Sequence, residues 1–76
     1  MNAPQVSEVM KVIDERRKEQ GLSVTDIAAA AGLGARSVER YFAGVRDFKA
    51  SAAVKLAVAL GTTASDIYGE AERRSN

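Results

Sequence analysis

The sequence predicts an all-α fold, a compact bundle of five short helices. Three observations favour this class. Apolar residues recur at helical spacing, capping residues and glycines divide the chain into short stretches, and no stretch is a convincing strand. Because 76 residues suffice for one small core, we assign residues 1–71 to a single domain.

The first predicted helix lies between Pro4 and Gly21, which suit a first-turn position and a C-terminal stop. Asn2 is a candidate cap for its start. One stripe of this segment is apolar at i, i+3, i+4 and i+7, and it consists of Val6, Val9, Met10 and Ile13. The opposite side is charged, so one face of this helix is expected to pack against a core.

Two shorter helices are predicted next. Ser23 has Asp26 three residues later, a pair similar to a capping box, and the helix that it opens ends at Gly32. A third helix is predicted for residues 35–43, and it ends at Gly44.

Two further helices complete the bundle. The fourth runs from Lys49 to Leu60 and is rich in alanine, which suits either a close-packed helix interface or tight packing in a small core. Thr63 and Asp66 form another capping pair that opens a short fifth helix. Residues 72–76 are expected to fray as a C-terminal tail.

Cysteine and histidine are both absent from the sequence. Their absence excludes disulfides, cysteine-based metal sites and the usual general base, and no phosphate loop or activated nucleophile is recognisable. We therefore predict a protein that is not an enzyme and has no cofactor, metal or small-molecule ligand. No apolar stretch approaches the roughly 18 residues of a membrane span and no signal peptide is recognisable, so a cytoplasmic location is expected.

Charge is unevenly distributed, although the net charge is only +1. Five basic and two acidic residues lie between Gly34 and Lys55, whereas the rest of the chain has six basic and eight acidic residues. A basic middle third favours a polyanionic partner, and an ordinary solvated surface gives the same pattern. Charge alone does not decide between them.

Residues 24–43 have the spacing of two helices joined by a tight turn. Such a unit needs a small residue where the helices meet, here Ala28, and a turn residue that tolerates positive φ, here Gly32. Apolar side chains must fill the wedge between the helices, and the candidates are Ile27, Ala31, Leu33, Val38 and Tyr41. Together these features predict a helix-turn-helix.

A longer pattern surrounds this unit, from about Val9 to Tyr68. It consists of Gly21, Leu22, Ser23, Asp26, Ile27, Ala28, Ala31, Gly32, Leu33, Val38, Gly44, Lys55, Leu56, Ala57, Ala59, Leu60 and Gly61. In this order and spacing the chain resembles the Cro and lambda-repressor type of helix-turn-helix protein, the XRE family. The resemblance implies a compact lambda-repressor-like bundle of four or five helices that binds DNA sequence-specifically, commonly as a homodimer that represses transcription.

Three positions depart from the family pattern. Val24 stands where members often have a glutamine that touches a phosphate and braces the next helix. Gly34 stands where serine or threonine usually caps the recognition helix. Phe48 and Lys49 replace a common Pro-Ser pair, so we expect Phe48 in the core and Asp47 as a cap.

The resemblance implies that the third helix enters the major groove. Its outward residues, carried over position by position, are Ala35, Arg36, Ser37, Glu39 and Arg40. Arg36 and Arg40 lie four residues apart on one helical face, and each can donate two hydrogen bonds to a guanine. Ala35 can touch a thymine methyl, Ser37 can donate to a base or a phosphate, and Glu39 can accept from cytosine or pair with a neighbouring arginine.

Flanking residues are expected to contact phosphates. Ser23 and Thr25 lie at the start of the second helix, where free N–H groups favour an anion, although Ser23 is also needed as a cap. Arg46 and Lys49 follow the recognition helix, where related proteins touch the DNA backbone. Such contacts position the protein but carry little sequence information.

One domain of this kind covers only a half-site, so we expect a weak homodimer that forms fully on DNA. The predicted dimer interface uses the last two helices and their connection: Leu60, Thr62, Thr63, Ile67 and Tyr68. Tyr68 is the leading anchor, and its alternative role is to cover one end of the core.

The leading prediction is a small bacterial or phage repressor whose dimer occupies an inverted-repeat operator in double-stranded DNA. One alternative is an antitoxin or another protein-interaction module on the same fold, for which only residues 70–76 are available as an extension. A second alternative is a helical interaction domain that has lost DNA binding, as Val24 in place of glutamine suggests.

Overall fold

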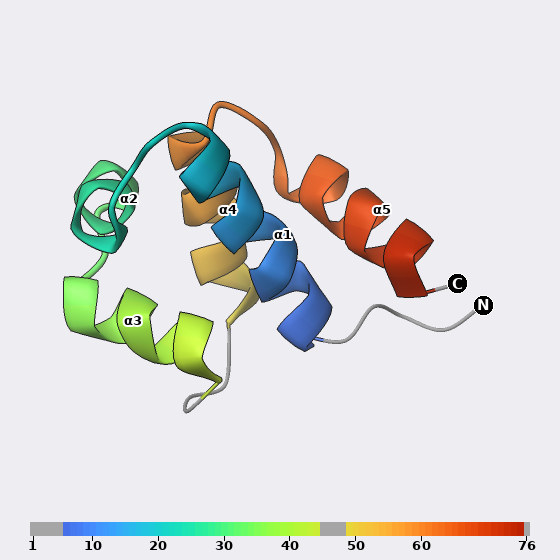
Figure 1. Ribbon diagram of the computed structural model, residues 1–76, viewed down its shortest axis with the longest axis horizontal. Coiled ribbons are helices and arrows are strands. Elements are labelled where there is room, and N and C mark those ends of the chain that lie inside the picture. The colour runs from blue at the N-terminus through green and yellow to red at the C-terminus, as the bar shows by residue number, and fades with distance from the viewer. Residues whose placement is uncertain (1–5, 45–48, 76) are drawn as a thin grey trace.

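The computed structural model describes residues 6–44 and 49–75, and within them the chain forms helices joined by short connections, without a strand (Figure 1). The helices are α1 (Val6–Glu19), α2 (Val24–Ala31), α3 (Ala35–Ala43), α4 (Ala50–Ala59) and α5 (Ala64–Ser75). The predicted all-α bundle of five helices is confirmed. The roles expected of Asn2, Pro4, Arg46, Asp47 and Phe48 fall on residues outside the described ranges.

One apolar core is shared by the five helices. α1 contributes Val9, Met10, Val12 and Ile13; the other helices and their ends contribute Ile27, Ala28, Val38, Tyr41, Ala52, Leu56, Ala57, Leu60, Ile67 and Ala71. No polar or charged residue of the described ranges is buried, so the core is held by removal of apolar surface from water.

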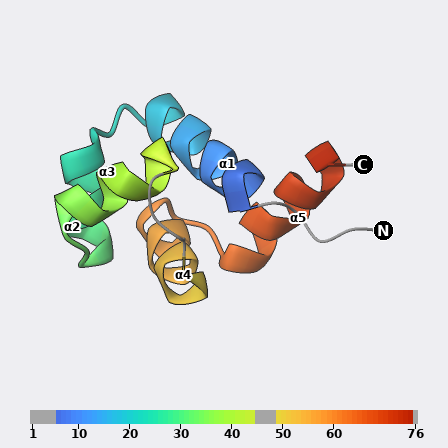
Figure 2. The same cartoon turned by 90° about the horizontal axis from the view of Figure 1, so that it is seen from below.

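The helices divide into two ends of the molecule. α2 and α3 lie together at one end, and α5 lies at the other, alongside α1 (Figure 1). α4 packs against both α2 and α5, and α3 also contacts α1. Seen from below, α3 is in front, with α1 and α4 on either side of it (Figure 2). This arrangement presents α3 at the surface of the bundle.

Local capping explains why α2 and α5 begin where they do. The Ser23 hydroxyl accepts a hydrogen bond from the Asp26 N–H at 3.0 Å, and the Asp26 carboxylate accepts one from the Ser23 N–H at 3.0 Å. The predicted capping box is therefore present. Thr63 caps α5 in the same way, because its hydroxyl accepts the Asp66 N–H at 3.1 Å.

Helix α5 is longer than the sequence indicates. Residues 72–76 were expected to fray, and this expectation is wrong for residues 72–75, which belong to α5; Asn76 lies outside the described residues. The reason is tertiary contact. Arg74 donates to both carboxylate oxygens of Glu15 on α1, at 2.9 and 2.6 Å, and Ala71 of the same helix is buried in the core.

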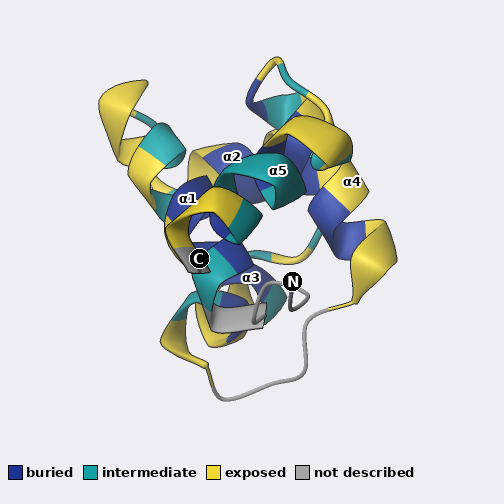
Figure 3. Cartoon of the chain, turned by 90° about the vertical axis from the view of Figure 1, so that its right-hand side faces the viewer, coloured by how far each residue is buried: buried dark blue, intermediate teal, exposed yellow. Residues whose placement is uncertain are grey.

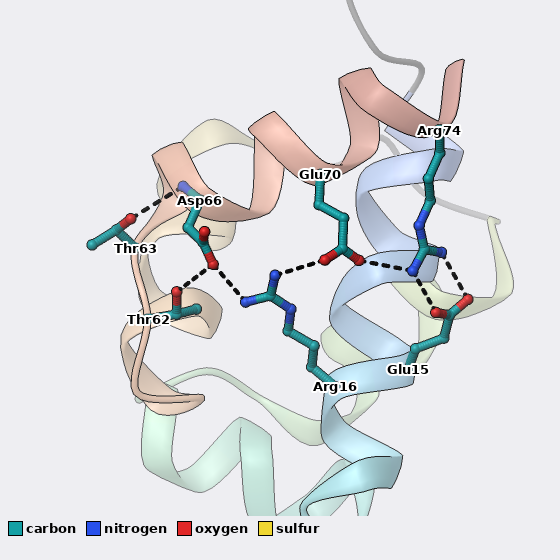
Figure 4. Close-up of polar contacts among 7 residues, drawn as sticks. All are labelled: Glu15, Arg16, Thr62, Thr63, Asp66, Glu70 and Arg74. Atoms are coloured by element: carbon teal, nitrogen blue, oxygen red, sulfur yellow. Dashed lines mark hydrogen bonds and ion pairs between the residues drawn. The ribbon is translucent and has the colours of Figure 1, made fainter. Parts of the chain in front are cut away.

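A network of ion pairs joins α5 to α1 (Figure 4). Arg16 on α1 contacts Asp66 at 2.7 Å and Glu70 at 2.9 Å, while Arg74 contacts Glu70 at 2.7 Å as well as Glu15. The hydrogen bond from Arg74 lowers the pKa of Glu15, and hydrogen bonds from Arg16 lower the pKa of Asp66 and of Glu70. The network therefore favours the ionised carboxylates.

These pKa directions predict a stability that falls in acid. A carboxylate with a lowered folded-state pKa stabilises the fold above its unfolded pKa, near 4 to 4.5, and this contribution is lost as the pH falls through the folded value. Arg74→Gln is expected to lower the thermal unfolding midpoint by a few degrees at pH 7, because it removes the pairs with Glu15 and Glu70. The midpoint of the variant should approach that of the unmodified chain at pH 3.

Thermal unfolding followed by circular dichroism at the two pH values measures this difference. Arg73→Gln is the matched control, because Arg73 is an exposed neighbour on α5 with no ion pair among the described residues. If Arg74→Gln lowered the thermal unfolding midpoint by the same amount at both pH values, the electrostatic explanation would be contradicted.

Candidate nucleic-acid interface

The helix-turn-helix predicted for residues 24–43 is formed by α2, a tight turn and α3. Ile27 and Val38 are completely buried between the two helices, and Ala28 permits close contact. Gly32 adopts φ +70° at the end of α2, a conformation that favours glycine, and the Leu33 N–H then bonds the Ala28 carbonyl at 2.9 Å. The turn fixes where α3 begins.

Helix α3 separates apolar from polar residues sharply. Val38 and Tyr41 are buried, whereas Arg36, Glu39 and Arg40 are exposed. Two other predicted base contacts, Ala35 and Ser37, are half-buried on the flanks of the same helix. Because 100° separates successive helical residues, Arg36 and Arg40 lie opposite the buried side of α3. The five predicted residues therefore share one helix, and the two arginines are outermost.

The cations of the bundle differ in how far they are neutralised. Arg16, Arg17 and Arg74 all pair with carboxylates. Arg36 and Arg40 are exposed and form neither an ion pair nor a hydrogen bond with any described residue. Lys49, at the start of α4, and Lys55, within α4, are also exposed and have no ion pair inside the described ranges. Positive charge is thus left available on α3 and α4, and at Arg73 on α5.

The first turns of α2 and α3 offer different electrostatic environments. Ser23 and Thr25 are exposed at the start of α2, but the Asp26 carboxylate shares that helix end and opposes a phosphate there. Gly34 begins α3 without a side-chain cap, no acidic residue occupies the first turn, and Arg36 lies within it. The start of α3 is therefore the more attractive of the two for an anion.

The residues predicted for a dimer interface are mostly engaged within the fold. Leu60 is 6% exposed and Ile67 is completely buried, so their assignment to an interface is corrected to the core. Thr62 donates to the Asp66 carboxylate at 2.8 Å, and Thr63 caps α5. Tyr68 is half-buried against the core.

Arg17 has a structural role that sequence reasoning missed. Its guanidinium donates to the Asp14 carboxylate at 3.0 and 2.7 Å and to the Leu22 carbonyl at 2.7 Å, and it lies 5.6 Å from the ring centroid of Phe42. One side chain therefore joins α1, the connection to α2 and the end of α3. Val24, at the usual position of the family's bracing glutamine, packs half-buried against the core.

The described residues contain neither a metal-binding cluster nor a membrane-spanning helix. No group of three histidine, cysteine, aspartate or glutamate side chains in residues 6–44 and 49–75 is placed to hold a metal ion. No helix in the same ranges is long and apolar enough to cross a membrane.

Arg17→Met tests the bracing of α3, because methionine retains most of the stem but not the guanidinium. The free energy of unfolding is expected to fall by about 1–3 kcal/mol, since a mostly buried charged donor with several hydrogen bonds is lost. Urea denaturation measures the change. Lys18→Met is the matched control, because Lys18 is exposed and also pairs with Asp14, and its loss should cost about 0.5 kcal/mol or less. Equal losses for the two variants would rule out a special role for Arg17.

Comparison with known proteins identifies the family. A family model described as helix-turn-helix (HTH_3) matches residues 13–67. No curated protein sequence matches the chain. The restriction-modification controller protein C.AhdI from Aeromonas hydrophila is similar in structure, with a TM-score of 0.75 and 25% identity, over 83% of this chain and 96% of that one.

The clp gene regulator ClgR from Corynebacterium glutamicum has the same fold in two structures, each with a TM-score of 0.78 and 18% identity over 96% of this chain. The match covers 79% of the ClgR chain in one structure and 96% in the other. With α2, the turn and α3 in the expected geometry, and the family model spanning α2 to α4 entirely, the chain belongs to the XRE-type helix-turn-helix family of DNA-binding regulators.

Proposed function

We propose that the chain is a transcriptional repressor that inserts α3 into the major groove of an inverted-repeat operator. One observation carries this proposal. Arg36 and Arg40 are exposed, lack a partner among the described residues and lie opposite the buried side of α3. Two arginine side chains on the exposed face of a helix, whose opposite face is packed into the core, are suited to the recognition of DNA bases.

The two arginines can read neighbouring bases. Four residues of α-helix rise about 6 Å, which is close to two base-pair steps of B-DNA. Each guanidinium can donate two hydrogen bonds to O6 and N7 of a guanine, so each half-site should contain guanine. Ala35 is suited to a thymine methyl and Ser37 to a base or a phosphate, while Glu39 can accept from cytosine or orient a neighbouring arginine.

Phosphate contacts fix the position of the helix in the groove. Lys49 is exposed at the start of α4, and Thr25 is exposed in the first turn of α2. Ser23 can contribute through its hydroxyl proton while its oxygen caps α2. Arg46 belongs to the same predicted set and lies outside the described residues. These contacts supply salt-dependent affinity without sequence preference.

The named relatives support a regulatory role. C.AhdI is described as a restriction-modification controller and ClgR as a clp gene regulator. We infer a homodimer that represses by covering a promoter, acting where the DNA is, in the cytoplasm of a bacterial cell. An antitoxin or other protein-interaction role is the alternative, and it has less support because both named relatives are described as regulators.

Selection of bound duplexes from a random pool tests the function directly. At about 0.15 M salt, where long-range charge effects are screened, we expect an inverted repeat with guanine in each arm. Weak salt-sensitive binding without any enriched sequence would reject sequence-specific regulation.

Arg36→Ala tests the recognition helix. It is expected to weaken binding to the selected site by about 1–3 kcal/mol and to relax the preference at one base position. Lys49→Ala should instead weaken binding similarly on all sequences and reduce the slope of log K against log salt by about one unit. Fluorescence anisotropy with matched and mismatched duplexes measures both effects.

Arg73→Ala provides the control, because it removes an exposed charge from α5, at the end of the bundle away from α3. It should leave affinity and sequence preference nearly unchanged. Intact affinity and preference in Arg36→Ala would show that another surface reads the DNA.

A further inference from the structure

The two ends of α3 are held in different ways. Its start is fixed by the turn from α2, where the Leu33 N–H bonds the Ala28 carbonyl at 2.9 Å. Near its other end, Phe42 is half-buried against the core, whereas Ala43 and Gly44 are exposed. Figure 3 shows this end of the ribbon in yellow, the colour of exposed residues. Phe42 is therefore the last side chain of α3 that packs against the rest of the bundle.

One side chain of α1 reaches Phe42. The Cζ atom of Arg17 lies over the Phe42 ring, 5.6 Å from its centroid. The guanidinium nitrogens donate elsewhere: Nε and Nη2 to the Asp14 carboxylate at 3.0 and 2.7 Å, and Nη1 to the Leu22 carbonyl at 2.7 Å. Because the N–H groups of a guanidinium lie in its plane, these bonds fix its orientation and leave its face for the ring. The position of the cation is thus set by α1 and its connection to α2.

The surroundings of this contact increase its importance. The Arg17 side chain is only 14% exposed, and a cation removed from water attracts an aromatic face more strongly than an exposed one. Among the described residues, Met10, Asp14 and Phe42 line part of a hollow of about 260 Å³ beside the contact. Close packing therefore does not by itself hold the end of α3 against α1.

The usual brace of the family is missing from this chain. Val24 stands where members often have a glutamine that braces the recognition helix, and a valine side chain has no hydrogen-bonding group. Val24 packs half-buried against the core instead. Arg17 provides a different link, because it starts from α1 and reaches the end of α3.

Arg36 and Arg40 depend on different supports as a result. Arg36 lies in the first turn of α3, beside the turn from α2, whereas Arg40 lies in the last turn, two residues before Phe42. A tilt of α3 about its start displaces Arg40 more than Arg36. A bidentate contact with guanine depends on accurate placement of the guanidinium, so the contact of Arg40 is the more sensitive of the two.

We propose that Arg17 is a positioning residue for DNA recognition, which fixes the end of α3 through Phe42 and thereby determines the base that Arg40 selects. This inference rests on the proposed function, because it takes α3 as the helix that reads the major groove. Arg17 acts without touching a base.

Fluorescence anisotropy with single-base-pair variants of the selected half-site tests the proposal. The preferences lost in Arg36→Ala and in Arg40→Ala first assign one base pair to each arginine. Arg17→Met is then expected to reduce discrimination at the Arg40 base pair about fivefold, and to leave discrimination at the Arg36 base pair within about twofold of the unmodified chain. Equal changes at the two base pairs would overturn the proposal, because a smaller folded fraction weakens binding to every duplex alike.

Three further variants isolate the contact with the ring. Phe42→Leu removes the ring but leaves the hydrogen-bond partners of Arg17, and it should reproduce the loss at the Arg40 base pair. Phe42→Tyr keeps the ring and should retain the preference. Lys18→Met is the matched control for the lost charge, because Lys18 is exposed on the same helix and also pairs with Asp14, so both preferences should be unchanged.

A direct phosphate contact by Arg17 would give a different result. Arg17→Met would then weaken binding equally on all duplexes and reduce the slope of log K against log salt by about one unit, while Phe42→Leu would change nothing. That pattern would overturn the positioning role.

Hydrogen exchange without DNA measures the brace itself. In Phe42→Leu and Arg17→Met, the acceleration of exchange at the amides of residues 40–43 should exceed that in α5 about fivefold, because only the end of α3 opens locally. Equal acceleration in both helices would show general destabilisation and reject the brace. Selection of no sequence by the unmodified chain would reject the proposed function together with this inference, whereas unchanged preferences in both variants would reject this inference alone.

Discussion

The burial of Val38 and Tyr41 fixes the rotation of α3, and the rest of the recognition surface depends on it. Both side chains are buried in the core, so one side of α3 faces inward. The helical repeat then leaves Arg36 and Arg40 on the opposite side. Gly32 and Ala28 set the approach of the two helices, and Arg17 secures the end of α3 through Phe42. The outward position of the two arginines is thus a consequence of packing.

The charged residues of different helices also have different roles. Arg16 on α1 and Arg74 on α5 differ from the arginines of α3, because carboxylates that join α1 and α5 neutralise them. Their attraction holds α5 against the bundle and does not contribute an available positive field. Arg36 and Arg40 have no described carboxylate partner, so their field is directed outward. A net charge of only +1 therefore conceals two exposed arginines on α3 that have no ion pair among the described residues, beside the exposed Glu39.

Features encoded within a few residues could be predicted from the sequence. The capping box of Ser23, the turn at Gly32 and the buried wedge depend on neighbours three to five positions apart. The exposure of each residue on α4 and α5 depends instead on distant helices. Ile67 is buried because other helices cover it, and residues 72–75 remain helical because Arg74 reaches Glu15 across 59 positions of sequence. Helical periodicity identifies an apolar residue but does not say whether a partner within the chain covers it.

The proposed function separates affinity from selectivity on α3. Phosphate contacts beside this helix would supply affinity without sequence preference, whereas the two arginines on its outer face would select bases. Because the buried side chains fix the rotation of α3, they also determine which base edges Arg36 and Arg40 could reach. Under this proposal, a change in the packing beneath α3 would alter base preference without removing either arginine.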